Sequence, residues 1–211
     1  MRNDEYEGTA SGFNSSFSIH HFFSILSITV NYFLAETTSK VEETMREVER
    51  IADQLKRAHE GGAWHGPSIG ELLADVSAEQ AASRPVEGAH SIWELVEHIE
   101  AWERAILRRL GGDPAQIYNT EEDWPPTRDA SEDAWQQTRK KLADTDAALR
   151  EASLRLDDAQ LDEPIIAEMS SRYVSLHGAV QHTLYHAGQI ALVKKALGLK
   201  LPTIIPQNQP A

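Results

Sequence analysis

Apolar residues recur every three or four positions in four long segments of this 211-residue chain. This spacing puts them on one face of an amphipathic α-helix, whereas a half-buried β-strand would alternate apolar and polar residues. The expected helices span about 41–60, 92–110, 131–152 and 172–197. A loop of about eighteen residues, 111–128, separates the second helix from the third. The pattern therefore predicts an all-α fold, a four-helix bundle with a long crossover loop.

Residues 1–44 differ in character from the rest of the chain. The stretch 17–35, FSIHHFFSILSITVNYFLA, carries no formal charge and is close to the minimum length of a membrane anchor. Its histidines and serines weaken the interpretations as an anchor or as a signal peptide, and so does the net negative segment before it. Met45 opens a strongly periodic helix, so a mis-set translation start is a third possibility and a real appended helix a fourth. We expect an N-terminal extension, 1–44, and a bundle domain, 45–211.

The charge balance and the lack of cysteine narrow the classes of function. Twenty Lys and Arg residues against thirty-three Asp and Glu give a net charge of −13. An acidic surface of this kind argues against nucleic acid as a partner, and against a membrane unless 17–35 is a real anchor. Without cysteine there is no disulfide, thiolate zinc site or cysteine nucleophile. We expect a cytoplasmic protein with a small-molecule substrate, whose chemistry depends on its nine histidines.

Three of these histidines interrupt apolar stripes that face the core. His182 and His186 are four residues apart on the last helix, so both imidazoles lie on one face, about one turn apart. His98 holds the same kind of position on the second long helix, between Leu95 and Trp102. Three imidazoles on one metal ion would leave positions open for water or substrate, as in catalytic sites. The alternative is that they are core histidines satisfied by hydrogen bonds.

Two segments carry a family resemblance. SIWELVEHIEAW at 91–102 and HTLYHAGQI at 182–190 resemble the DinB-like (YfiT-type) family of metal-dependent enzymes, and the resemblance covers nearly all of 45–200. It implies a four-helix bundle with a divalent metal, commonly zinc or nickel, on one histidine of the second helix and two of the fourth. In this sequence those positions are His98, His182 and His186. The resemblance also implies a homodimer.

The same resemblance implies the class of reaction. Relatives include thiol S-transferases and proposed hydrolases, so we expect a thiol S-transferase that joins a low-molecular-weight thiol to an electrophile at the metal. The first alternative is a metal-dependent hydrolase of a small ester or amide. The second alternative is a non-catalytic, metal-binding, stress-associated bundle, which would take up metal without turnover.

Further site residues are weaker candidates, because each has a plainer role in capping or packing a helix. Glu94, one turn before His98, and Tyr185 are the nearest candidates for a catalytic base or orienting group. Trp64 and Trp102 are candidate pocket walls, and Gln189 is positioned to orient a metal ligand. His59, at the end of the first helix, is expected to interact favourably with the helix dipole.

Overall fold

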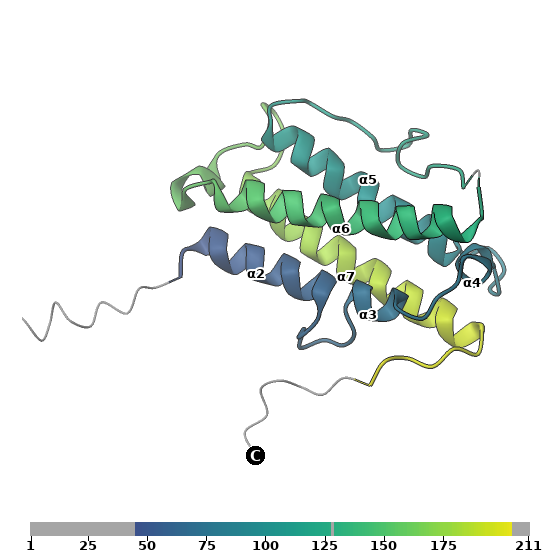
Figure 1. Cartoon of the computed structure of the whole chain (residues 1–211). Helices are drawn as coiled ribbons and strands as arrows, with labels where there is room; N and C mark the ends of the chain where they lie inside the picture. Colours follow the sequence, from purple (N-terminus) through teal and green to yellow (C-terminus); the bar gives the residue numbers. More distant parts are fainter. Residues whose placement is uncertain (1–44, 128, 204–211) are drawn as a thin grey trace, which may run out of the picture. The chain divides into compact units, whose positions relative to one another are not determined.

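The computed structural model describes residues 45–127 and 129–203 (Figure 1). The chain divides into two units, Met1–Thr44 and Met45–Ala211, and the described residues belong to the second. The predictions about 1–44, including the uncharged stretch 17–35, therefore lie outside the described residues. Among the described helices, none combines the length and the apolar character that crossing a bilayer requires.

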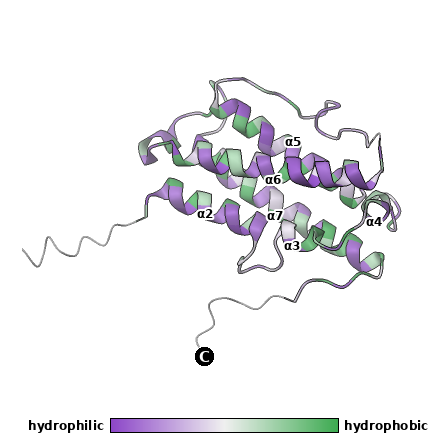
Figure 2. Ribbon diagram, viewed as in Figure 1, coloured by the Kyte–Doolittle hydropathy of each residue, from purple (hydrophilic) through white to green (hydrophobic). Residues whose placement is uncertain are grey.

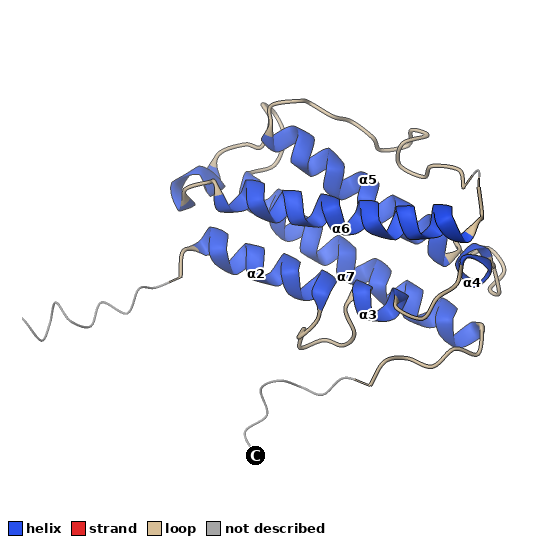
Figure 3. Cartoon of the chain, viewed as in Figure 1, coloured by secondary structure: helices blue, strands red, loops and turns tan. Residues whose placement is uncertain are grey.

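Four long helices form a bundle, which confirms the predicted all-α fold (Figures 1 and 3). They are α2 (Glu47–Glu60), α5 (Ile92–Leu110), α6 (Glu132–Leu154) and α7 (Arg172–Ala196). Helices α2 and α5 each pack against both α6 and α7, so that α2 and α5 are diagonal partners across the bundle. Two short helices, α3 (Ile69–Leu73) and α4 (Ala78–Ala82), join α2 to α5, and a 3₁₀ turn, η1 (Asp158–Asp162), follows α6.

Local sequence sets the helix boundaries. At the start of α5, the Ser91 hydroxyl accepts a hydrogen bond from the Glu94 backbone N–H, and the Glu94 carboxylate accepts one from the Ser91 N–H. This capping box satisfies two backbone donors that the first turn of a helix leaves free. At the end of α7, Gly198 adopts φ 74°, a left-handed conformation that favours glycine.

The apolar core has two main parts. One is packed around Trp93, Trp135 and Ile190, and the other around Leu55 and Leu149. Purple hydrophilic and green hydrophobic residues alternate along the long helices, as expected when each helix turns one face inward (Figure 2). On α5, α6 and α7, the two parts of the core are separated by buried polar side chains, and these define the functional region.

The long connection between α5 and α6 confirms the predicted crossover loop. It leaves α5 after Leu110, returns along that helix and reaches the N-terminus of α6 at Glu132 (Figure 1). Its return path brings Asp123 and Trp124 over the middle of α5, although they are more than twenty residues from His98 in the sequence.

Candidate metal site and pocket

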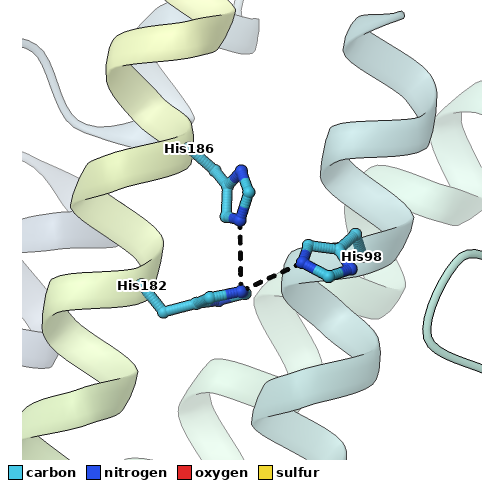
Figure 4. Close-up of side chains that lie close together, drawn as sticks. All are labelled: His98, His182 and His186. Carbon is cyan, nitrogen blue, oxygen red and sulfur yellow. Dashed lines mark hydrogen bonds between the residues drawn. The ribbon is translucent and has the colours of Figure 1, made fainter. Parts of the chain in front are cut away.

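The three predicted histidines, His98, His182 and His186, come together at the interface of α5 and α7 (Figure 4). We call these three residues the metal cluster. His98 extends from α5, and His182 and His186 extend from successive turns of α7. The His182 Nε2 lies 3.1 Å from the Nε2 of His98 and 3.1 Å from the Nε2 of His186. His98 and His186 are buried and His182 is half-buried. One nitrogen of each ring thus points to a common point.

The opposite ring nitrogens of two of these histidines have partners. His98 Nδ1 donates to the backbone carbonyl of Asp123 at 2.7 Å, and His186 Nδ1 lies 2.8 Å from the Oε1 of Gln189. A carbonyl oxygen only accepts hydrogen bonds, so Nδ1 of His98 carries the proton and its Nε2 keeps a lone pair. Hydrogen bonds of this kind orient histidine ligands in metal sites and fix their tautomer.

The electrostatics of the cluster favour neutral imidazoles. Burial and the neighbouring His186 and His98 lower the pKa of His182 to about 3. Burial also lowers the pKa of His98 and that of His186. At neutral pH the cluster therefore presents lone pairs to one another and has too few protons to bridge them. A cation between the nitrogens would relieve this repulsion.

The donor set fits one divalent metal ion. Two nitrogens bound tetrahedrally to zinc at about 2.0–2.1 Å lie about 3.3 Å apart, close to the 3.1 Å separations in this cluster. The cluster is all imidazole, which suits zinc and nickel among other metals. His98, His182 and His186 could therefore bind a metal, and their geometry leaves its identity open.

The crossover loop holds the His98 ring from its other side. The indole of Trp124 stacks on His98 with ring centroids 3.8 Å apart and an 8° angle between the planes. The Asp123 carboxylate accepts a hydrogen bond from the Trp102 indole N–H at 2.7 Å, and its Oδ1 lies 3.2 Å from His98 Nδ1. Sequence reasoning missed Asp123 and Trp124, because a loop has no periodicity that predicts which residues turn inward.

A pocket of about 490 Å³ opens beside the metal cluster. His98, His182 and Trp102 line it, together with apolar residues of α5 and α7 such as Ile106 and Ala179. Polar groups line it as well; they include Glu103, Arg109, Ser170 and Ser175. The pocket can hold a small molecule next to the metal position.

The other predicted site residues lie in different environments. Trp64 is fully exposed and is not among the residues lining the pocket. Glu94 takes part in the N-terminal cap of α5 and pairs with Arg84. Tyr185 is 66% exposed, with its ring 5.0 Å from and edge-on to His186.

A second buried polar cluster crosses the middle of the bundle next to the metal cluster. We call it the acid layer; each long helix contributes one residue, namely His59, Glu103, Asp146 and Thr183. Glu103 Oε1 lies 2.7 Å from His59 Nε2 and accepts a hydrogen bond from the Thr183 hydroxyl at 2.9 Å. Asp146 Oδ1 lies 3.8 Å from His59 Nε2. His59 does end α2 as expected, but its side chain is buried in this layer.

The surroundings of the acid layer raise the pKa values of two of its residues. Burial alone would lower the pKa of His59, but the charge of Glu103 and the hydrogen bond to it raise that pKa above its ordinary value. Burial raises the pKa of Asp146 to about 6. Among the described residues, Glu103 Oε2 and Asp146 Oδ1 are buried and have no hydrogen-bond partner. Because Glu103 also lines the pocket, one residue of the acid layer borders the space beside the three histidines.

Sequence reasoning missed the acid layer, although a signal for it exists. Glu103 and Asp146 come four residues after Ile99 and Leu142, and His59 comes four residues after Leu55. All three polar residues thus continue a core-facing stripe, as His98 does. The sequence around each of these three residues contains many other charged residues. For this reason the three positions look like part of the exposed face of the helix.

Comparison with known proteins establishes the family. The sequence profile of the DinB superfamily matches residues 68–190, more than half of the chain. The chain belongs to the DinB superfamily. This confirms the resemblance seen in the sequence.

A solved structure supports the fold. The crystal structure of a conserved protein from Enterococcus faecalis matches with a TM-score of 0.56 and 19% identity, over 74% of this chain and 99% of that one. At this identity the match shows a shared fold alone. No curated protein matched the chain.

Proposed function

We propose that this DinB superfamily protein is a metal-dependent thiol S-transferase. Zinc or nickel bound by His98, His182 and His186 would activate a low-molecular-weight thiol for attack on an electrophile. The observation that carries the proposal is the convergence of three Nε2 atoms at the wall of a pocket of about 490 Å³. In that position, one small molecule could reach both the metal and the pocket.

Three neutral histidine ligands would favour an anionic sulfur as a further ligand of the metal. Three neutral imidazoles would leave the full charge of a divalent metal uncompensated, and such a metal lowers the pKa of a bound thiol or water. The chain has no cysteine, so a sulfur nucleophile has to come from a separate molecule. Glu103 lines the pocket, its buried Oε2 has no hydrogen-bond partner among the described residues, and we assign this carboxylate the role of accepting the thiol proton.

A hydrolase is the second candidate, and the same oxygen of Glu103 supports it. A carboxylate that accepts a proton from a thiol can also accept one from water, which would then attack a small ester or amide. A non-catalytic metal-binding bundle is the remaining alternative, and it differs by taking up metal without turnover.

A paired activity assay distinguishes these functions. The full chain, loaded with zinc or nickel, is given a panel of thiols and 1-chloro-2,4-dinitrobenzene: a C–S bond forms, the C–Cl bond breaks, chloride leaves and the thiol proton passes to Glu103. The proposal predicts turnover with metal, none with His182→Ala, and a loss of about 10²-fold or more with Glu103→Gln. Hydrolysis of p-nitrophenyl acetate without thiol turnover would favour the hydrolase. Absence of both activities with metal bound would favour the non-catalytic bundle.

We also propose that the protein is a cytoplasmic homodimer. Large apolar side chains are exposed along α7, among them Val174 at 56%, Tyr185 at 66% and Leu192 at 62%. These three positions lie on one side of the helix, since the eleven residues from Val174 to Tyr185 make about three turns and the seven from Tyr185 to Leu192 about two. Sedimentation equilibrium tests the association: Leu192→Asp should shift a dimer toward monomer, and a monomeric wild type would contradict the proposal.

A further inference from the structure

Arg109 stands out among the residues that line the pocket because it is a cation with no acidic partner among the described residues. It lies in the last turn of α5 and lines the pocket together with His98 and His182. The neighbouring Arg104 and Arg108 pair with acidic residues, Glu122 for both and Asp113 for Arg108. Within the described part of the chain, no carboxylate lies within 4.0 Å of the Arg109 guanidinium.

Among the described residues, Arg109 is held in place without a hydrogen bond to either terminal nitrogen of its guanidinium. Its Nε donates to the backbone carbonyl of Ala115 at 2.8 Å, and its Cζ lies 5.8 Å from the ring centroid of Trp102. No hydrogen bond within the described residues uses either terminal nitrogen of the guanidinium. Those two nitrogens form the planar fork that binds a carboxylate with two parallel hydrogen bonds.

The position of the guanidinium relative to the metal cluster limits the size of a ligand. The Trp102 ring centroid lies 5.8 Å from Arg109 Cζ and 6.0 Å from the ring centroid of His182. Arg109 and His182 therefore lie near the same indole and line the same pocket, where a small molecule can be bound. The lining around that indole includes Ile106 and Ala179, so the middle of such a ligand meets apolar surface.

Arg109 is half-buried, and its free terminal nitrogens can pair with an anionic group that enters the pocket. Burial is the main cause that lowers the pKa of Arg109, followed by the charge of Arg108. In a chain of net charge −13, acidic residues are abundant, yet none pairs with this guanidinium in the described structure. The hydroxyls of Ser170 and Ser175, 3.2 Å apart, line the same pocket and add hydrogen-bond donors.

We infer that Arg109 binds the carboxylate of the small molecule that occupies the metal pocket. This inference rests on the proposed function, which it deepens: the substrate class becomes a compact carboxylic acid with an apolar middle. The carboxylate belongs either to the thiol or to the electrophile, and both sources present the same group to Arg109.

Two pairs of probes test the inference on the full chain. The first pair, 3-mercaptopropionate and 3-mercaptopropanamide, is titrated into cobalt-loaded protein, and binding is followed by the sulfur-to-cobalt charge-transfer absorption. The second pair, 3-phenylpropionate and 3-phenylpropanamide, is titrated into metal-free protein, and binding is followed by tryptophan fluorescence. A preference for the acid in the first pair assigns the carboxylate to the thiol, and a preference in the second pair alone assigns it to the electrophile.

The inference predicts that wild type binds the acid at least about tenfold more tightly than the amide in one or both pairs, because hydrogen bonds between charged groups are stronger than those to a neutral amide. Arg109→Gln should abolish this preference, Arg109→Lys should keep part of it, and Arg108→Gln should keep all of it. Equal binding of acid and amide in both pairs, or a preference that survives Arg109→Gln, would overturn it. If no thiol binds the metal but the phenylpropionate preference depends on Arg109, the proposed function fails and this inference stands.

Discussion

Two clusters of buried polar side chains lie next to each other in this bundle, and they differ in what completes them. In the metal cluster, His182 Nε2 lies 3.1 Å from the Nε2 atoms of His98 and His186, and the neutral rings have too few protons to bridge both contacts. In the acid layer, His59 and Glu103 meet at 2.7 Å, a hydrogen-bond distance, and the pKa of His59 is raised. The first cluster could bind a metal ion, whereas the second is held by hydrogen bonds between its own residues.

This difference assigns separate tasks to neighbouring parts of one core. The acid layer ties the four long helices together, since each helix contributes one residue to it. The metal cluster involves only α5 and α7 and opens to the pocket. We therefore expect substitutions in the acid layer to change stability, and those at Glu103 to change activity as well because it lines the pocket. Substitutions in the metal cluster should change metal binding.

The largest effect on stability is expected from His59→Ala. Removal of one partner of a buried ion pair leaves the other charge unpaired and costs about 3–5 kcal/mol of the free energy of unfolding. Urea unfolding of metal-free protein measures this loss, and His177→Ala, at a half-buried position of α7, is the control. A loss below about 1 kcal/mol would mean that the acid layer does not hold the helices together.

The acid layer should also make stability depend on pH. The pKa of Asp146 is about 6 in the folded protein and about 3.9 in an unfolded chain, so the folded state holds the proton more tightly. The cost of ionising this buried carboxyl is fully present above pH about 6 and is relieved as the pH falls toward 4. His59 acts in the same direction, because its raised pKa contributes stability that is lost as the pH rises through it.

Asp146→Asn should therefore flatten the pH dependence, by on the order of 3 kcal/mol between pH 4 and 7. Urea unfolding at a series of pH values measures the slope. Asp144→Asn, at an exposed position two residues earlier on α6, should leave it unchanged. An identical slope in wild type and Asp146→Asn would contradict the protonation assigned to the layer.

A smaller effect is expected where the crossover loop supports the metal cluster. Asp123→Ala removes the carboxylate that contacts His98 and Trp102 but keeps the backbone carbonyl. Loss of such a supporting group typically weakens metal binding by about 10–100-fold. Competition with a chromogenic chelator gives the affinity, and Glu122→Ala, one residue earlier, is the control. Equal metal affinities in Asp123→Ala and Glu122→Ala would show that the Asp123 carboxylate does not support the metal site.

The smallest effect is expected at Trp64. Its side chain is fully exposed and lies outside the pocket lining, so Trp64→Ala should change the free energy of unfolding by less than about 0.5 kcal/mol. Metal affinity and probe binding should also stay the same. A clear loss of metal or probe binding in Trp64→Ala would instead support the prediction that this tryptophan forms a pocket wall.

The sequence predicts the fold well because helix periodicity is a local property. The stripes that begin at Ile92 and Trp135 and the glycine at 198 define helices that the structure reproduces. The metal cluster is predictable for the same reason, since His98 and the HxxxH pair occupy positions where an apolar residue is expected.

The site features that the sequence does not reveal depend on contacts between segments that are far apart in the chain. Asp123 and Trp124 meet His98 only through the path of the crossover loop, and no periodic pattern encodes that path. Arg109 looks like any other cation in an Arg-rich helix end, and only the structure shows that no acidic partner pairs with it in 45–127 and 129–203. In the acid layer, the sequence alone does not show whether each charged residue lies on the exposed or the buried face of its helix. Only the packing of the four helices brings these residues together.

The central claim is that His98, His182 and His186 bind one metal ion, and the most direct test is the metal content of the full chain. The protein is purified without a polyhistidine tag and measured by elemental mass spectrometry beside His98→Ala, His182→Ala and the control His177→Ala. The account predicts about one equivalent of zinc, nickel or a similar divalent metal in wild type and the control, and near zero in the other two variants. A wild type that stays metal-free after reconstitution, or an equivalent that survives both substitutions, would contradict it.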